Sequence, residues 1–398
     1  MQLKSLWTID DIRQRLPANG GVGFLFHATD PATVQFAFEA GEFREEDYWE
    51  QPPFIGSPIF LDNRVIGCHI ISAIPAQFWA GSHSTIRRFR SVAYEPSLQM
   101  AADCGLTHVG LGALIPFATQ YGQYGHRPES LRLTTGHAAT VAAIWQTVVA
   151  VARDCEVRPE HLQYAIFGAA GSIGANTAQW LVRQGCTHLR LVDIPERMPR
   201  LRELAAQIRE SSPFTAVSCH VPNDLATFAE FDVAVIATNR AEPCIDVNLL
   251  RKAPVWIDDS HPRAVLPEAE AALASDVMYL ECYLRGPQGM SQTFPFRLPT
   301  SRDCYSCFAE VCICWMEGMP ADFVVGAPSL TQISLMDRLL PQYGFFPGPL
   351  LSKSGRDISR EQLQRASDRL RHRARNRSSF RDGTTSLHAQ SVGGLVVA

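Results

Sequence analysis

The chain has 398 residues, of which 46% are hydrophobic and 19% are charged, a composition typical of a globular protein with two or three domains. Its net charge is −4, and no apolar run approaches the length of a membrane-spanning helix. We therefore expect a cytoplasmic protein with no integral membrane segment and no nucleic-acid partner. The eleven cysteines are odd in number and scattered, which favours reduced thiols over a disulfide framework.

Residues 1–130 are predicted to form an α/β domain that binds the substrate. Strand-like runs such as "GVGFLFHAT" and "RVIGCHIISAI" alternate there with helical segments. The segment "TTGHAATVAAIWQTVVAVARDC", residues 134–155, has apolar residues at helical spacing, and Thr134 or Thr135 is expected to cap it. We interpret this helix as the link to a second domain.

Residues 131–300 are predicted to form that second domain, a Rossmann-type, doubly wound parallel sheet preceded by the linking helix. A βαβ unit begins with a strand at 164–167, continues through a glycine-rich turn and a helix, and ends with a strand at 189–192. The apolar runs "FDVAVIAT" (231–238) and "APVWIDDS" (253–260) predict further buried parallel strands.

The turn "GAAGSIG" of this unit indicates a dinucleotide site. Its glycines would allow a tight turn, close approach of a pyrophosphate and packing of a helix whose N-terminus favours anions. An acid follows at the end of the second strand, as dinucleotide sites require. A glycine turn that served only to pack the helix on the strand would need no such acid. The expected cofactor-binding residues are Gly168, Gly171, Ser172, Ile173, Gly174, Asp193 and Thr238.

The choice between NADH and NADPH stays open. A carboxylate at Asp193 would accept hydrogen bonds from the ribose hydroxyls and repel a 2′-phosphate, which favours NADH. Arg197 and Arg200 lie just beyond it and could bind that phosphate instead.

Residues 301–350 are predicted to form a small helical region that contains the cysteine-rich stretch "CYSCFAEVCIC" (304–314). A helix is expected over 303–318, and four sulfurs on it could not easily surround one metal, so we expect no metal site. Cys304 and Cys307 would lie in its first turn, where the helix dipole stabilises a thiolate. Cys312 and Cys314 are expected to be packed as small hydrophobic residues.

Residues 351–398 are expected to form a basic and partly disordered tail, because they carry a charge of about +6 against about −10 for the rest of the chain. Ser359 and Gln362 form a possible capping box for a short basic helix. Such a tail is more often a solvated extension than a docking site for an acidic partner.

Six motifs, taken together, resemble the cyanobacterial long-chain acyl-[acyl-carrier-protein] reductases, which form fatty aldehydes. The resemblance covers about residues 20–350 and is specific because the motifs occur in the same order. They are "GFLFHATD" (23–30), "VGLGALIPF" (109–117), "LTTGHAATVAAI" (133–144), "GAAGSIG" (168–174), "WIDDSHPRAV" (256–265) and "SCFAEVCICWMEG" (306–318).

The resemblance implies an N-terminal acyl-binding domain, a Rossmann domain and a nucleophilic cysteine in a Cys-Phe-Ala-Glu motif, which is Cys307 here. It also implies that acyl-carrier protein or acyl-CoA is the partner. This chain differs from the family at Asp259–Pro262, where a Gly-Gly-Tyr-Pro run is usual, and at Asp193, where the loop is usually basic.

The hypothesis that follows is NAD(P)H-dependent reduction of an acyl thioester to an aldehyde through a Cys307 acyl-enzyme. His27, His137 and His261 are candidates for proton transfer, although a single histidine more often has a structural role. Glu310 is expected to orient a neighbour rather than to act as the base. The alternatives are a dehydrogenase of a free small molecule with a structural Cys307, and a dinucleotide-binding scaffold without turnover.

Overall fold

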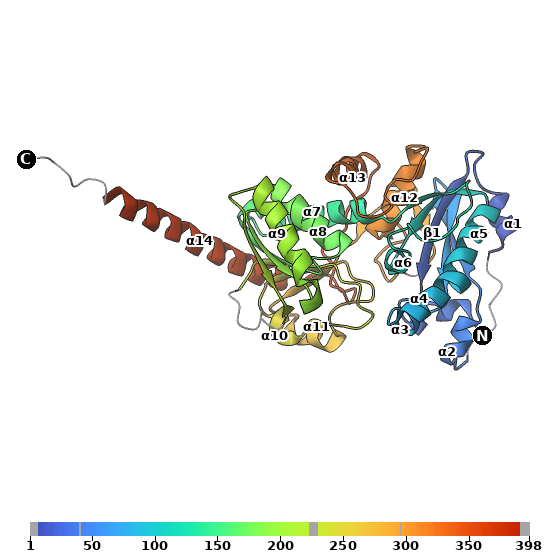
Figure 1. Cartoon of the computed structure of the whole chain (residues 1–398), viewed down its shortest axis with the longest axis horizontal. Coiled ribbons are helices and arrows are strands. Elements are labelled where there is room, and N and C mark those ends of the chain that lie inside the picture. The colour runs from blue at the N-terminus through green and yellow to red at the C-terminus, as the bar shows by residue number, and fades with distance from the viewer. Residues whose placement is uncertain (1–6, 40, 223–229, 295, 391–398) are drawn as a thin grey trace, which may run out of the picture.

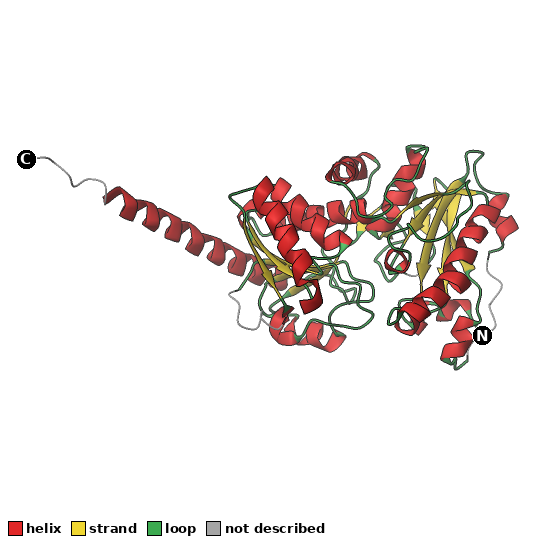
Figure 2. Cartoon of the chain, in the orientation of Figure 1, coloured by secondary structure: helices red, strands yellow, loops and turns green. Residues whose placement is uncertain are grey.

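The computed structural model describes residues 7–39, 41–222, 230–294 and 296–390, with the backbone alone at residue 36 and at 376–390. Two α/β units lie side by side, and a long helix, α14, extends from one of them (Figures 1 and 2). No helix within the described residues is long and apolar enough to cross a membrane.

The first unit is built on a mixed six-stranded sheet in which β1, β3, β4 and β5 run parallel and β2 and β13 run antiparallel to their neighbours. Its strand order is β13 (Ser291–Gln292), β2 (Phe54–Leu61), β3 (Arg64–Ser72), β1 (Gly21–His27), β4 (Leu106–Leu111) and β5 (Arg132–Thr134). Its helices are α1 (Ile9–Arg13), α2 (Glu45–Trp49), α3 (Ala76–Trp79), α4 (His83–Phe89), α5 (Glu95–Asp103) and α6 (Ile115–Ala118). Strands β5 and β13 belong to this sheet although they lie beyond residue 130.

The second unit confirms the Rossmann-type fold expected from the sequence, because all its strands are parallel and follow the doubly wound order. That order is β11 (Met278–Glu281), β10 (Val255–Asp258), β9 (Val233–Ile236), β6 (Gln163–Phe167), β7 (His188–Val192) and β8 (Ala216–His220). The helices are α7 (His137–Asp154), α8 (Ser172–Arg183), α9 (Met198–Ser211), α10 (Val247–Leu250) and α11 (Pro267–Leu273).

The central strands are short apolar runs because both faces of the sheet are covered. Every residue of β9 and β10 is buried, and Figure 1 shows α8 and α9 on one side of the sheet and α10 and α11 on the other. The chain order reverses between β6 and β9. Such a switch point leaves a crevice at the carboxyl ends of the strands.

The remaining elements lie over and between the two units. They are β12 (Leu284–Arg285), β14 (Asp303–Cys304), β15 (Phe346–Pro347), α12 (Ser306–Met316), α13 (Leu330–Gln342) and α14 (Arg360–Gln390). Helix α12 packs on β1 and β4 of the first sheet and against α7. The cysteine-bearing helix is therefore held at the junction of the two units.

The basic helix α14 is longer than expected and is paired with the acidic body along its first turns. Ser359 and Gln362 form the predicted reciprocal cap, with both hydrogen bonds 3.1 Å long. Arg365 lies 3.3 Å from Asp276, and Arg371 lies 3.1 Å from Glu156. The opposite charges of tail and body thus meet within the molecule. The residues after 390 lie outside the described part of the chain.

Candidate active site

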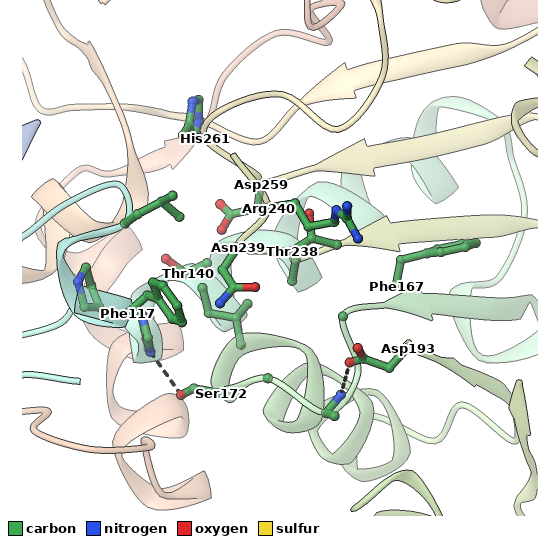
Figure 3. A pocket seen from close by; sticks show the side chains of 18 of the residues that line it. Phe117, Thr140, Phe167, Ser172, Asp193, Thr238, Asn239, Arg240, Asp259 and His261 are labelled. Atoms are coloured by element: carbon green, nitrogen blue, oxygen red, sulfur yellow. Dashed lines mark hydrogen bonds between the residues drawn. The ribbon is translucent and has the colours of Figure 1, made fainter. Parts of the chain in front are cut away.

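A cavity of about 610 Å³ opens at the switch point of the Rossmann sheet and reaches the first unit (Figure 3). The first unit contributes side chains such as Leu114 and Phe117, while α12 and its preceding loop contribute Tyr305, Ser306 and Cys307. Of the predicted cofactor-binding residues and the predicted nucleophile, all but Gly174 line the cavity: Gly168, Gly171, Ser172, Ile173, Asp193, Thr238 and Cys307.

The three glycines of the loop differ in how little space each leaves for a side chain. Gly168 has φ +78°, and a Cβ there would lie 2.3 Å from the Ala237 carbonyl oxygen, so this turn requires glycine. A Cβ on Gly174 would lie 2.3 Å from the Gly168 oxygen, so this residue allows α8 to pack on the loop. A Cβ on Gly171 would lie 3.1 Å from the same Gly168 oxygen, a less severe contact.

The N-terminus of α8 is available to bind an anion. Its N-cap residue, Gly171, offers no side-chain hydrogen bond, and Ser172 and Ile173 of its first turn line the cavity. Unpaired N–H groups and the positive end of the helix dipole favour a phosphate at such a position. The local geometry is therefore that of a Rossmann dinucleotide site.

Asp193 is fixed at the end of β7 by two main-chain groups. Its carboxylate accepts hydrogen bonds from the N–H of Ala170 at 2.8 Å and of Ile194 at 2.9 Å. Arg197 and Arg200 are exposed and line the same part of the cavity. Asp193 could therefore accept a hydrogen bond from a 2′-hydroxyl, and Arg197 and Arg200 could bind a 2′-phosphate.

Thr238 lies two residues beyond the end of β9, across the switch point from the glycine loop. Its N–H donates to the Ser260 hydroxyl at 3.1 Å, and the two hydroxyls lie 3.2 Å apart. Thr238 therefore lines the cavity while Ser260 holds both its main chain and its hydroxyl.

Cys307 is the second residue of α12 and faces the cavity. The helix begins at Ser306 and not at Asp303, so the placement of Cys304 in its first turn is wrong. Cys304 lies on β14, which pairs with β12, and its side chain is fully buried. Cys312 and Cys314 are buried in the core, as expected.

The thiol of Cys307 is less acidic than the helix dipole alone would make it. Burial raises its pKa well above the usual range, and the Asp259 carboxylate raises that pKa further. The main-chain N–H groups of Phe308 and Cys307 lower the pKa, but they do not offset the loss of solvation. The expected lowering of the pKa by the helix N-terminus is therefore wrong in its net sign.

Glu310 fixes α12 to the start of α7. Its carboxylate accepts hydrogen bonds from the N–H of Gly136 at 3.0 Å, from that of Ala139 at 2.6 Å and from the Thr134 hydroxyl. Burial raises its pKa to about 7 against these hydrogen bonds. Glu310 thus orients its neighbours, as predicted, and the cap of α7 is Gly136 rather than Thr134 or Thr135.

The three candidate histidines have different environments. His27 is buried, with Nδ1 2.6 Å from the Ala28 oxygen and Nε2 accepting from Leu114 N–H at 3.0 Å, so its role is structural. His137 lines the cavity with Nδ1 3.0 Å from the Ser172 hydroxyl, and burial lowers its pKa to about 4. His261 also lines the cavity.

Sequence reasoning gave no role to the groups around His261. The side chain of Lys353 is buried and donates hydrogen bonds to Glu281 at 2.7 Å and to the Asp258 carbonyl oxygen at 3.1 Å. Its Nζ lies 3.4 Å from His261 Nε2. Asp259 lines the cavity nearby. Its position directly after a buried strand was a signal for a site residue. Lys353 is the only lysine of the basic tail, but no motif around it indicated a site.

Across the described ranges, no three His, Cys, Asp or Glu side chains are grouped to hold a metal ion. No family model matches the chain.

Solved structures that resemble the chain include quinate dehydrogenase from Corynebacterium glutamicum in complex with NAD, with 15% identity, a TM-score of 0.34 and coverage of 81% of this chain and 99% of that one. L-tryptophan dehydrogenase from Nostoc punctiforme has 10% identity, a TM-score of 0.37 and coverage of 90% of each chain. Glutamate dehydrogenase from Thermus thermophilus has 15% identity, a TM-score of 0.37 and coverage of 90% and 82%. With TM-scores below 0.5, these likenesses carry no weight for function.

Proposed function

We propose that the protein is a nicotinamide-dependent oxidoreductase that reduces an acyl thioester to an aldehyde through an acyl-enzyme on Cys307. The observation that carries this proposal is that Cys307 and the glycine loop line one cavity. A thiol at a helix N-terminus beside a dinucleotide loop fits covalent catalysis followed by reduction. Acyl-carrier protein or coenzyme A would carry the acyl group.

The residues of the loop fit NADH or NADPH. The Gly171 turn and the uncapped start of α8 would hold the pyrophosphate, and Asp193 would lie at the adenosine ribose. When bound, the nicotinamide supplies a hydride. Thr238, held by the Ser260 hydroxyl, would line the cleft between the two ends of the cofactor.

In the acylation step, the Cys307 sulfur forms a bond to the thioester carbonyl carbon, and the bond to the carrier's sulfur breaks. One thioester replaces another, so little free energy separates the two sides of the reaction. The N–H groups of Cys307 and Phe308 at the start of α12 lower the pKa of the thiol and would stabilise negative charge developing on the sulfur. Gly136 and Glu310 fix the helix that carries the nucleophile.

A dehydrogenase of a free small molecule is the second candidate. The observation that favours it is the raised pKa of Cys307, which keeps the thiol protonated at neutral pH unless a base removes the proton. In that case Cys307 would line the cavity without forming a covalent intermediate.

Replacing Cys307 separates the two candidates. The wild-type protein, incubated with octanoyl-CoA or with octanoyl-acyl-carrier protein, should gain the mass of one octanoyl group on Cys307 and release octanal after NADH or NADPH is added. Cys307→Ser should lose the thioester adduct and reduce octanal formation by about 10³-fold or more. Cys219→Ser is the matched control, because Cys219 lies on β8 outside the cavity. Undiminished octanal release by Cys307→Ser would favour the second candidate.

A further inference from the structure

Two adjacent aspartates at the end of β10 have opposite environments. The Asp258 carboxylate is buried and accepts hydrogen bonds from the Ser260 N–H at 2.7 Å, the Ala264 N–H at 3.1 Å and the Tyr279 hydroxyl. The Asp259 carboxylate hydrogen-bonds none of the residues that the structure describes and points into the cavity between His261 and Thr238 (Figure 3). Side chains alternate along an extended chain, which accounts for the difference.

Asp259 and Cys307 line the same cavity, and the Asp259 carboxylate acts on the thiol electrostatically. Within the described residues, Asp259 is the charged group with the largest effect on the pKa of the Cys307 thiol. Burial raises the pKa of Asp259 itself well above that of an ordinary carboxyl group. Three charged groups affect this pKa: Lys353 lowers it, and Glu281 and Asp258 raise it.

The other bases near Cys307 are already engaged. The Glu310 carboxylate accepts two N–H groups and a hydroxyl and does not line the cavity. His261 Nε2 lies 3.4 Å from the Lys353 ammonium and 3.5 Å from Glu281. His137 is a weak base because its pKa is about 4. Among the described residues that line the cavity, Asp259 is thus the carboxylate with both oxygens free of hydrogen bonds.

We propose that Asp259 is the general base for Cys307. Its carboxylate takes the thiol proton as the sulfur bonds to the thioester carbonyl carbon, and it gives that proton to the carrier's sulfur as the original carbon–sulfur bond breaks. The carrier leaves as a free thiol, Asp259 is again a carboxylate, and no oxidant, reductant or cofactor takes part. This role rests on the proposed acyl-enzyme at Cys307.

The surroundings of Asp259 suit this role. A carboxylate whose pKa is raised accepts a proton from a thiol more readily than an ordinary carboxylate does, and general bases work best with a pKa near the working pH. An anion beside the thiol also keeps the sulfur protonated until substrate arrives. Removing the carboxylate should therefore make the free thiol more acidic and, at the same time, make acylation slower.

The test measures these two opposite effects in the absence of nicotinamide. Acylation by octanoyl-CoA is followed by release of free coenzyme A thiol and by the mass of the Cys307 adduct. Alkylation of Cys307 by iodoacetamide at pH 9 is followed by peptide mass spectrometry. The variants are Asp259→Asn and Asp259→Ser, with Glu268→Gln, an exposed acid of α11, as the control. Thermal unfolding and NADH binding report whether each variant is folded.

Asp259→Asn and Asp259→Ser should acylate about 10²- to 10⁴-fold more slowly than wild type. They should be alkylated faster, by roughly tenfold for each unit by which the thiol pKa falls. Acylation by wild type should rise with pH as Asp259 ionises, and the variants should lack that rise. Folded variants that acylate at the wild-type rate, or lose alkylation and acylation together, would overturn the proposal. Absence of any adduct in the wild-type protein would instead refute the acyl-enzyme.

Discussion

Gly136 is the residue whose replacement most directly tests how Cys307 is positioned. It caps α7 in a left-handed conformation with φ +78°. A Cβ added there would lie 2.2 Å from the Cys307 Cβ and 2.3 Å from its Cα. Alanine at this position therefore cannot be accommodated unless α7 and α12 move apart.

The size of the effect follows from these contacts. Restoring an ordinary contact of 3.4 Å from 2.2 Å requires a displacement of about 1.2 Å. A left-handed alanine costs about 1–2 kcal/mol, and overpacking typically costs about 1–3 kcal/mol more. Gly136→Ala should thus lower the free energy of unfolding by about 2–5 kcal/mol. Misplacing a reacting group by about 1 Å can reduce its rate about 10²-fold.

Gly318→Ala is the matched control. Gly318 also has a positive φ, of +60°, but a Cβ there would meet no atom within 4 Å. It lies just beyond the end of α12, so its variant should lose only the backbone cost of about 1–2 kcal/mol and should acylate Cys307 normally. Urea unfolding measures the stability of each variant, and octanoyl-CoA adduct formation measures the acylation rate. Equal stability and equal acylation of the two variants would refute the reasoning.

Two further predictions concern buried and cofactor-facing carboxylates. Because the pKa of Glu310 is raised from 4.5 to about 7, its ionisation should lower the free energy of unfolding as the pH rises through this interval, and Glu310→Gln should remove that dependence in urea titrations. A pH profile identical to wild type would contradict this assignment. Asp193→Asn should weaken NADH binding and strengthen NADPH binding, because the carboxylate that accepts from the ribose hydroxyls and repels a 2′-phosphate is lost. Fluorescence titrations should show the ratio of the two affinities change about tenfold or more. An unchanged ratio would place Asp193 away from the ribose.

Local sequence patterns were sufficient for the Rossmann unit. The strands over Gln163–Phe167 and His188–Val192 lie within a residue of their predicted bounds, because short apolar runs and glycine turns are local signals. The glycine loop is equally local, since its steric demands arise from the loop and from one neighbouring strand. These features could be predicted without knowing how the rest of the chain packs.

The start of α12 could not be predicted in the same way. Cys304 pairs in a strand with Leu284, a contact between residues far apart in the sequence, and this pairing delays the helix until Ser306. The cap of α7 is likewise set by Glu310. Its carboxylate accepts a hydrogen bond from the Thr134 hydroxyl, so that hydroxyl is not free to cap the helix. In both cases a tertiary hydrogen-bonding partner overrode a local preference.

The order of residues by itself determined that this chain would place a glycine loop after a buried strand and a cysteine near a helix start, because these depend on neighbours along the chain. The tertiary structure decided the acidity of that cysteine and which residues surround it. The pKa of Cys307 depends on desolvation and on Asp259, and the surroundings of Asp259 depend on Lys353 from the C-terminal segment. Electrostatic free energies in a buried cavity are set by distances through space, which sequence separation does not record.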